Sequence, residues 1–220
     1  MVTAGPMATV TDILTLTQWF SPGYPVGAFA YSHGLEWAID HGQIITAEHA
    51  GVWISTVLNH GAGWNDSLFL AAAYRANSAD VAEIDAQCRA FAASAERLKE
   101  TDLQGAAFCE VTQKVWSADL EGLTYPVAVG RAAWLQGLPL DLTTQFYLQA
   151  FIANLATIAM RLVPLGQTEG QKLIRALTPL CTQLAERTSG ASLDDLSNTA
   201  FLTDVAAMHH ETQYSRIFRT

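Results

Sequence analysis

The 220-residue sequence lacks the marks of several common protein classes. It contains no GxxxxGK[ST] loop, so it does not itself bind a nucleotide through a Walker motif. Lys and Arg number only 12 against 21 Asp and Glu, which gives a formal net charge of −9. Nucleic acids and anionic membranes select basic surfaces. The charge balance therefore favours other proteins, or cations, as partners.

Cysteines and long apolar runs are also scarce. The three cysteines, Cys88, Cys109 and Cys181, form neither a CxxC pair nor a zinc-type spacing, so we interpret them as buried thiols in a reducing compartment. Residues 1–11 have neither the basic residues nor the apolar run of a signal peptide. The most apolar stretch, 146–163, is interrupted by polar residues and falls short of the roughly 20 apolar residues of a spanning helix. We therefore expect a cytoplasmic protein.

Alternating β-branched runs, the usual mark of strands, are missing, and apolar residues recur at spacings of three and four, as in helices. Half of the residues are hydrophobic, enough for a sizeable core. With helices and loops of ordinary length, the chain predicts an all-α fold: a single-domain globular bundle of about ten helices. We expect a flexible N-terminus over residues 1–10 and one helical domain over 11–220, which ends in a docking tail.

Local signals predict where several helices begin and end. Asp141 is the expected N-cap of a central helix that Pro164 ends. Pro126 and Pro179 each suit the first turn of a new helix. The Ala-rich, charged segment 78–100 is most simply one exposed amphipathic helix.

Residues 21–32 form the first irregular loop, with two prolines, two glycines and three aromatic residues between predicted helices. Two interpretations are open. Large aromatic groups on a rigid backbone suit recognition of another protein, but the same aromatics could fill the core beneath a rigid turn. The residues expected to fix the backbone are Pro22, Pro25, Gly27 and, just beyond the loop, Gly34.

The second irregular loop spans residues 161–171. Thr168 is the expected cap of the next helix, which places Gln167 and Gln171 near a helix N-terminus. These glutamines could satisfy orphan backbone groups, and Arg161 could complement the dipole of its own helix. A role in contact with a partner is the alternative.

The C-terminal residues 209–220 place two arginines among aromatic and apolar side chains. Termini stay ordered only when something holds them, and Arg with aromatics is enriched in protein interfaces. The segment therefore predicts a docking tail. In the alternative interpretation Ile217 and Phe218 fold back onto the protein's own core and the arginines are solvated.

Two chemical functions, hydrolysis and metal binding, are alternatives to a docking function. Ser32 lies in a loose version of the GxSxG elbow of serine hydrolases, but that elbow requires a preceding strand, whereas helical spacing surrounds it here. His209, His210 and Glu211 could bind a metal ion, although neighbours on a helix point about 100° apart and HExxH spacing is absent. We therefore expect no catalytic residue, no built-in metal site and no cofactor.

Three segments, residues 21–36, 161–171 and 210–220, together resemble the UreF family of urease accessory proteins, and the resemblance extends from about Ile13 to Thr220. It implies an all-helical, dimer-forming chaperone that is not an enzyme. Such a scaffold assembles with UreD (also called UreH) and the GTPase UreG on apo-urease. There it regulates GTP-dependent nickel insertion during urease maturation.

The resemblance also implies roles for particular residues. Arg216 and Phe29 match positions tied to complex formation, and Arg161 matches a basic position tied to control of the GTPase. The expected partner-binding residues are Phe29, Tyr31, His210, Glu211, Tyr214, Arg216, Phe218 and Arg219, and the expected GTPase-regulating residues are Arg161, Gln167 and Gln171. The alternative function is a metallochaperone that holds nickel directly through His209, His210 or Glu211. Residues 97–105 fit the family pattern loosely, and no role is transferred to them.

Overall fold

The computed structural model describes residues 8–219. Of the N-terminus expected to be flexible, residues 1–7 lie outside the described residues, as does Thr220, while Thr9 already caps the first helix. Within the described part, ten α-helices and two 3-10 helices form the fold, and no strand occurs there. The helices are α1 (Val10–Trp19), η1 (Ala28–Ala30), α2 (Leu35–Asp40), α3 (Ala47–His60), α4 (Ala62–Arg75), α5 (Val81–Ala90), α6 (Ala95–Trp116), α7 (Tyr125–Leu135), α8 (Leu140–Leu162), α9 (Gln167–Ser189), η2 (Leu193–Asp195) and α10 (Phe201–His210). The predicted all-α bundle of about ten helices is confirmed.

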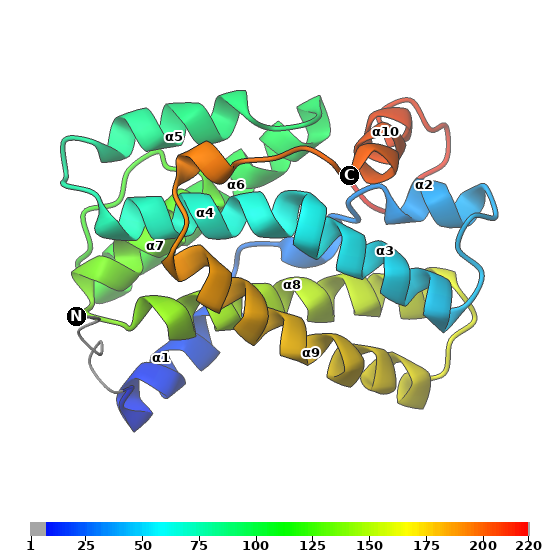
Figure 1. The fold of residues 1–220 in the computed structure, drawn as a ribbon, viewed down its shortest axis with the longest axis horizontal. Helices are drawn as coiled ribbons and strands as arrows, with labels where there is room; N and C mark the ends of the chain where they lie inside the picture. The colour runs from blue at the N-terminus through cyan, green and yellow to red at the C-terminus, as the bar shows by residue number, and fades with distance from the viewer. Residues whose placement is uncertain (1–7, 220) are drawn as a thin grey trace.

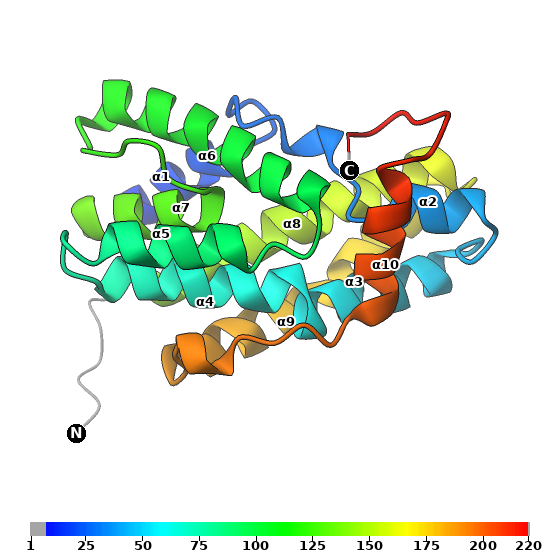
Figure 2. The ribbon, with the colours of Figure 1, turned by 90° about the horizontal axis from the view of Figure 1, so that it is seen from above.

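Helix α8 runs through the middle of the bundle, as predicted for the central helix (Figure 1). It packs along α9, while α4 packs along α7 and α6 lies against α7. Helices α3 and α4 follow one another across the molecule, and α2 and α10 lie together at one end (Figures 1 and 2). The two long loops and the C-terminal tail lie near this end or along α8.

The core consists of two large clusters of apolar side chains. One fills the space between α3, α4, α8 and α9, and the other is built on α1, α6 and α7 around Trp19 and Phe108, whose rings meet edge to face at 5.3 Å. Close crossing of α4 and α7 depends on Gly130, where an added Cβ would lie 2.1 Å from the Leu70 carbonyl oxygen. The cysteines are buried free thiols, as expected.

Some predicted helix boundaries are confirmed and others are wrong. Pro126 lies in the first turn of α7, and Pro164 follows the end of α8, as predicted. Asp141 is not the N-cap of α8, because Pro139 takes that position and Asp141 falls in the first turn, where its charge still suits the helix dipole. Likewise Gly166, not Thr168, caps α9, and its N–H donates to the Glu169 carboxylate.

Two further helix predictions were wrong. Pro179 does not open a helix but lies exposed inside α9, whose apolar stripe continues past it against α3 and α8. Segment 78–100 is not one helix: it breaks after α5, and Ser94 caps α6 by accepting a hydrogen bond from the Arg97 N–H at 3.1 Å. In both places tertiary packing and capping overrode the local pattern.

Candidate functional site

The first loop contains both buried and exposed aromatic side chains. Tyr24 and Tyr31 are buried, and the Tyr24 hydroxyl lies 2.7 Å from the Thr112 hydroxyl on α6. Phe29, on η1 between them, is 67% exposed. The loop is held to α8 by Asn154, whose amide donates to the carbonyl oxygens of residues 28 and 31. The tyrosines therefore fix the loop, and Phe29 is the aromatic residue that it presents to solvent.

Gly34 joins this loop to α2 at a point of very close packing. Its φ of +72° lies in the left-handed region that glycine occupies freely. An added Cβ would lie 2.7 Å from the Ala207 backbone nitrogen and 2.9 Å from the Ala206 Cβ, both on α10. Gly27 also has a left-handed φ, +70°, at the start of η1. Pro22 and Pro25 lie exposed in the preceding turns.

The tail turns back after α10 and ends beside η1 (Figure 2). Glu36 on α2 holds it there: its two carboxylate oxygens accept hydrogen bonds from the backbone N–H groups of Ile217 at 2.7 Å and Phe218 at 2.9 Å. The Arg219 N–H donates to the Ala30 carbonyl at 2.7 Å. The backbone of the tail is thus hydrogen-bonded to the first loop and to the side chain of Glu36 on α2.

His210, at the end of α10, lies fully buried between two carboxylates. Its Nε2 is 2.9 Å from Glu36 and its Nδ1 is 2.9 Å from Glu96 on α6. Ionised carboxylates only accept, so both ring nitrogens donate when both acids are charged. Arg216 lies 2.5 Å from the other Glu96 oxygen and also donates to the His210 carbonyl. We call Glu36, Glu96 and His210 the tail seat.

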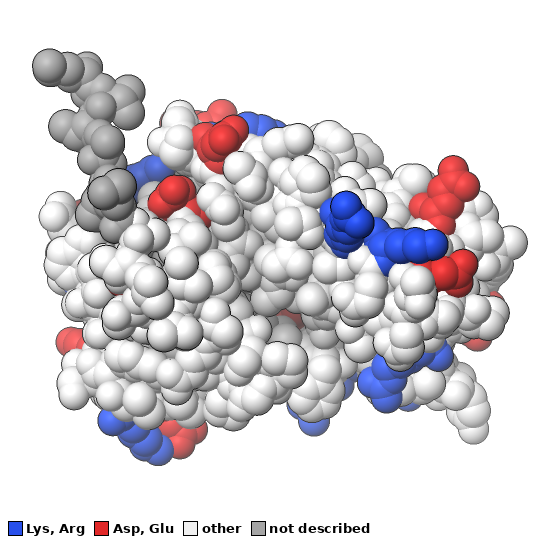
Figure 3. Space-filling view, turned by 90° about the horizontal axis from the view of Figure 1, so that it is seen from below, with Lys and Arg blue, Asp and Glu red and all other residues white. Residues whose placement is uncertain are grey.

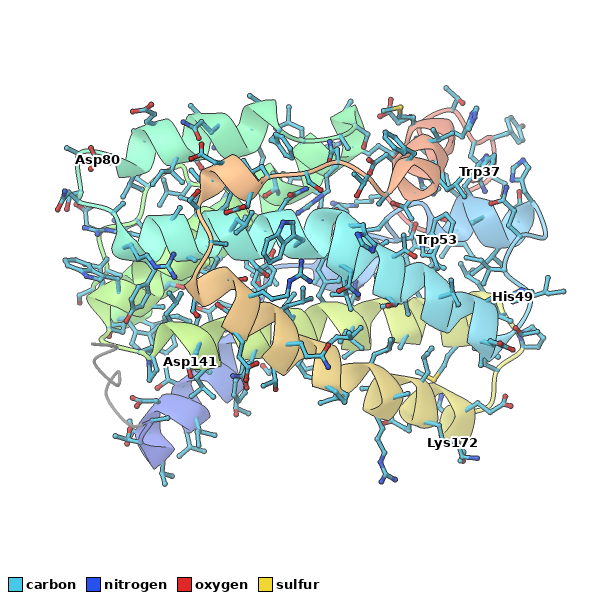
Figure 4. The ribbon with its side chains drawn as sticks, viewed as in Figure 1. Trp37, His49, Trp53, Asp80, Asp141 and Lys172 are labelled. Atoms are coloured by element: carbon cyan, nitrogen blue, oxygen red, sulfur yellow. The ribbon has the colours of Figure 1, made fainter. Side chains whose placement is uncertain are left out.

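The three residues considered for a metal ion face different partners. His210 is enclosed in the tail seat, and Glu211 accepts hydrogen bonds from the first N–H groups of α6, Ala95 and Glu96. His209 is exposed and stacks on Trp37 of α2 (labelled in Figure 4), with ring centroids 4.9 Å apart. These side chains do not converge on one ion, and residues 8–219 contain no group of three or more potential ligands that could hold one.

The second loop meets the tail through Arg161. Phe218 is buried in the core cluster between α3, α8 and α9, and the Arg161 guanidinium lies over its ring at 5.6 Å from the centroid. Gln167 and Gln171 are exposed in the first two turns of α9. The three segments that carry the family resemblance are therefore brought together at the tail, by Glu36 and Ala30 from the first and by Arg161 from the second.

The tail agrees with neither sequence interpretation in full. Phe218 folds back onto the core, as in the self-packing interpretation, but Ile217 is 71% exposed and Tyr214 is fully exposed. Arg216 is paired with Glu96 rather than solvated. The Arg219 side chain bonds to the Tyr31 hydroxyl. The tail is both anchored and able to offer apolar side chains.

A second polar network lies deeper, beside the tail seat. His33 is 3.2 Å from Glu100, Arg97 bridges Glu100 and Asp66, and the Tyr147 hydroxyl donates to Asp66 at 2.7 Å. Burial alone would raise the pKa of Glu100, but His33 and Arg97 bring it below its ordinary value. Burial raises the pKa of Tyr147, and Asp66 raises it further. The network borders a cavity of about 60 Å³.

Sequence reasoning missed the acidic half of this site. Glu36 closes the first motif, 21–36, yet received no role, and Glu96 lay in a segment interpreted as an exposed helix. Carboxylates in first turns look like ordinary dipole partners. Arg216 and Arg219, two arginines among apolar tail residues in an acidic chain, were the available signal, because an arginine pairs readily with a carboxylate.

Ser32 does not form a hydrolase elbow. It is buried directly before α2, and its hydroxyl oxygen lies 3.4 Å from the Glu36 N–H, which donates to it. No strand precedes it in the described chain. None of the helices formed by residues 8–219 has the length and apolarity needed to cross a membrane.

The fold and site define an all-helical protein whose C-terminal tail is seated on buried carboxylates and exposes apolar side chains. A UreF family model matches residues 44–178. The chain is 63% identical to the urease accessory protein UreF of Ruegeria pomeroyi, over 97% of this chain and all of that one. Identity is 58% with UreF of Roseobacter denitrificans, over 94% and 93%, and 42% with UreF of Rhodopseudomonas palustris, over 99% and 98%. The chain belongs to the UreF family of urease accessory proteins.

Proposed function

We propose that this protein is a non-catalytic scaffold of urease maturation in the cytoplasm. It assembles with UreD (UreH) and the GTPase UreG on apo-urease and regulates GTP-dependent nickel insertion, without an enzymatic activity of its own. The observation that carries the proposal is the seated tail: Phe29, Tyr214 and Ile217 are exposed on adjoining segments whose backbones are fixed. Exposed aromatic and aliphatic side chains on a fixed backbone suit a protein interface, because the backbone does not have to become ordered on binding.

Helix α10 adds apolar surface beside the tail. Its outward residues recur at helical spacing and are all exposed, although each is a large hydrophobic: Phe201, Leu202, Val205 and Met208. A contiguous exposed apolar stripe on one helix is typical of an interaction site. We propose that α10 and the tail together contact UreD.

The expected partner-binding residues divide into three groups under this proposal. Phe29, Tyr214 and Arg219 are exposed and contact the partner directly. Tyr31, His210 and Phe218 are buried, so they act by fixing the loop and tail. Arg216 and Glu211 hold the start of α6 and the tail together through Glu96 and the backbone of residues 95 and 96.

Control of the GTPase is proposed for the end of α8 and the start of α9. Arg161, Gln167 and Gln171 are exposed, and Arg161 reaches the tail through the Phe218 ring. A partner bound to the tail would therefore contact or shift Arg161 directly. That contact supports a regulatory position next to, but outside, the UreD surface.

Self-association is proposed on another face. Figure 3 shows the side on which α1 and α9 lie, and most of its middle carries no Lys, Arg, Asp or Glu. Helix α1, which carries the exposed Val10 and Leu14, lies on this side of the bundle. A weakly charged face with exposed apolar residues supports the homodimer.

Co-purification of the tagged chain from a urease-producing cell tests the proposed function. We expect UreD and UreG to elute with the wild-type chain. The Arg216→Ala variant, which frees the tail from Glu96, serves as the comparison and should lose most of both partners. Recovery of the wild-type chain without either partner would contradict the proposal.

A further inference from the structure

The cavity beside the deeper polar network is partly open to solvent and shares a wall with the tail's support. Helix α10 lines it with Thr203, Asp204 and Ala207, and α6 lines it with Arg97 and Glu100. Other lining residues come from α3, α4, α5 and the loop before α2. The position of α10 therefore decides how open this cavity is to solvent.

Helix α10 is held by few apolar contacts. Its buried residues are only Thr203, Ala206 and His210, and its large hydrophobics face solvent. At its N-terminal end the backbone bonds to the His60 carbonyl through Thr199 and Ala200. Its C-terminal end depends on the tail seat. Elements with few buried apolar contacts are the first to open locally.

The tail seat and the cavity network are built on the same two short segments. His33 pairs with Glu100 in the cavity network, and three residues later Glu36 holds the tail. On α6, Glu96 of the tail seat and Glu100 of the network are one turn apart. His33 adopts a left-handed φ of 52°, which a non-glycine residue keeps only when its surroundings enforce it.

We propose that the seated tail holds α10 in place as one wall of the cavity, so that withdrawal of the tail opens the cavity further to solvent. The close contact of Gly34 with Ala206 and Ala207 makes α10 and the start of α2 move as one unit. Withdrawal of the tail removes the bond from Arg216 to the His210 carbonyl, so that the His210 ring then holds the C-terminal end of α10 to Glu36 and Glu96. This inference goes beyond the scaffold function and does not depend on which partner captures the tail.

Cys88 reports on the cavity directly. It lines the cavity, whereas Cys109 and Cys181 are buried elsewhere and serve as controls within the same molecule. Burial raises the pKa of the Cys88 thiol to about 12, so alkylation is slow while the thiol stays buried. Iodoacetamide labelling of the full chain, resolved by peptide mass spectrometry, gives the rate at each cysteine.

The test variant combines Arg216→Ala with Phe218→Ala. The matched control is Tyr214→Ala, which lies in the same tail but is fully exposed. In the double variant we expect the labelling rate of Cys88 to rise at least about tenfold, as for loss of a charge-assisted hydrogen bond. The labelling rates of Cys109 and Cys181 should stay at wild-type values, and so should all three rates in the control variant. Arg216→Ala alone replaces the double variant if the latter does not fold. An unchanged Cys88 rate, or an equal rise at all three cysteines, would overturn the proposal.

Discussion

Glu36 and Arg216 are the residues on which the site depends, and only one of them was recognisable in the sequence. An arginine among apolar tail residues stands out, whereas a glutamate in a helical first turn does not. The role of Glu36 comes from two backbone N–H groups more than 180 residues away in the chain. Burial of individual side chains was predictable only as alternatives, as in the loop where Tyr31 is buried and Phe29 is not.

Substitution of Phe29 tests whether this residue contributes to partner binding or to the stability of the fold. We expect Phe29→Ala to keep its melting temperature within a few degrees, because the ring is 67% exposed, and to lose UreD binding. Tyr31→Ala, two residues away and buried, is the control and should cost about 3–5 kcal/mol of unfolding free energy, as for other buried aromatics. Thermal melts and a pull-down check both. A large drop in melting temperature for Phe29→Ala would assign that ring to the core.

The lowered pKa of Glu100 predicts that the free energy of unfolding depends on pH. Its pKa is lower in the folded protein than its ordinary value, which is about 4.3. The stabilisation is therefore present above that ordinary value and is lost as pH falls through the folded pKa. Urea midpoints measured from pH 7 to acid should fall less steeply for Glu100→Gln than for the wild type. Parallel curves for the two proteins would exclude Glu100 as a source of the acid sensitivity.

At the scale of elements, the sequence predicted helix type and number well and some boundaries badly. Three-and-four spacing is a local property, so the central helix α8 was recognisable, and Pro126 marked the first turn of α7. The break between α5 and α6 depends on Ser94 as a cap and on burial of Glu96 and Glu100, which no local pattern reveals. Pro179 was misplaced because α9 gains more from packing along α8 than it loses at one proline.

Pro179 therefore marks a local cost that α9 tolerates. Proline in a helix interior removes one backbone hydrogen bond and crowds the preceding turn. Because Pro179 is exposed, its ring contributes no buried contact with another helix. We therefore expect Pro179→Ala to stabilise the protein by about 1–3 kcal/mol. Urea unfolding monitored by circular dichroism measures the change. Equal or lower stability of the variant would mean that α9 requires the kink.

At the scale of the whole molecule, three segments that lie far apart in the chain, 21–36, 161–171 and 210–220, meet at one end of the bundle. The family resemblance placed them in one functional group, but their contact could not be derived from spacing, since it depends on how α2, α8 and α10 pack. Arg161 shows this most clearly, because its partner Phe218 lies in the last residues of the chain. The deeper network of Arg97 and Glu100 was not predicted at all.

Arg161 should affect regulation rather than assembly. The cation–π contact of the exposed Arg161 with the Phe218 ring contributes only about 0.5–1 kcal/mol, so Arg161→Ala should leave the complex with UreD and UreG intact on a sizing column. We expect urease activation per GTP hydrolysed to change, and Arg161→Lys, which keeps the cation, to lie closer to wild type. Normal activation per GTP in Arg161→Ala would remove this residue from the regulatory site.

The most direct test of the seated tail as the docking element is a titration of purified UreD against the chain and its Ile217→Asp variant. Ile217 is 71% exposed, and only its backbone N–H contacts the tail seat, so the substitution changes the offered surface and leaves the seat intact. Val52→Asp, at a similarly exposed position on α3, is the matched control. We predict that Ile217→Asp weakens the Kd at least about tenfold while Val52→Asp binds as wild type. Wild-type affinity in Ile217→Asp would contradict the account.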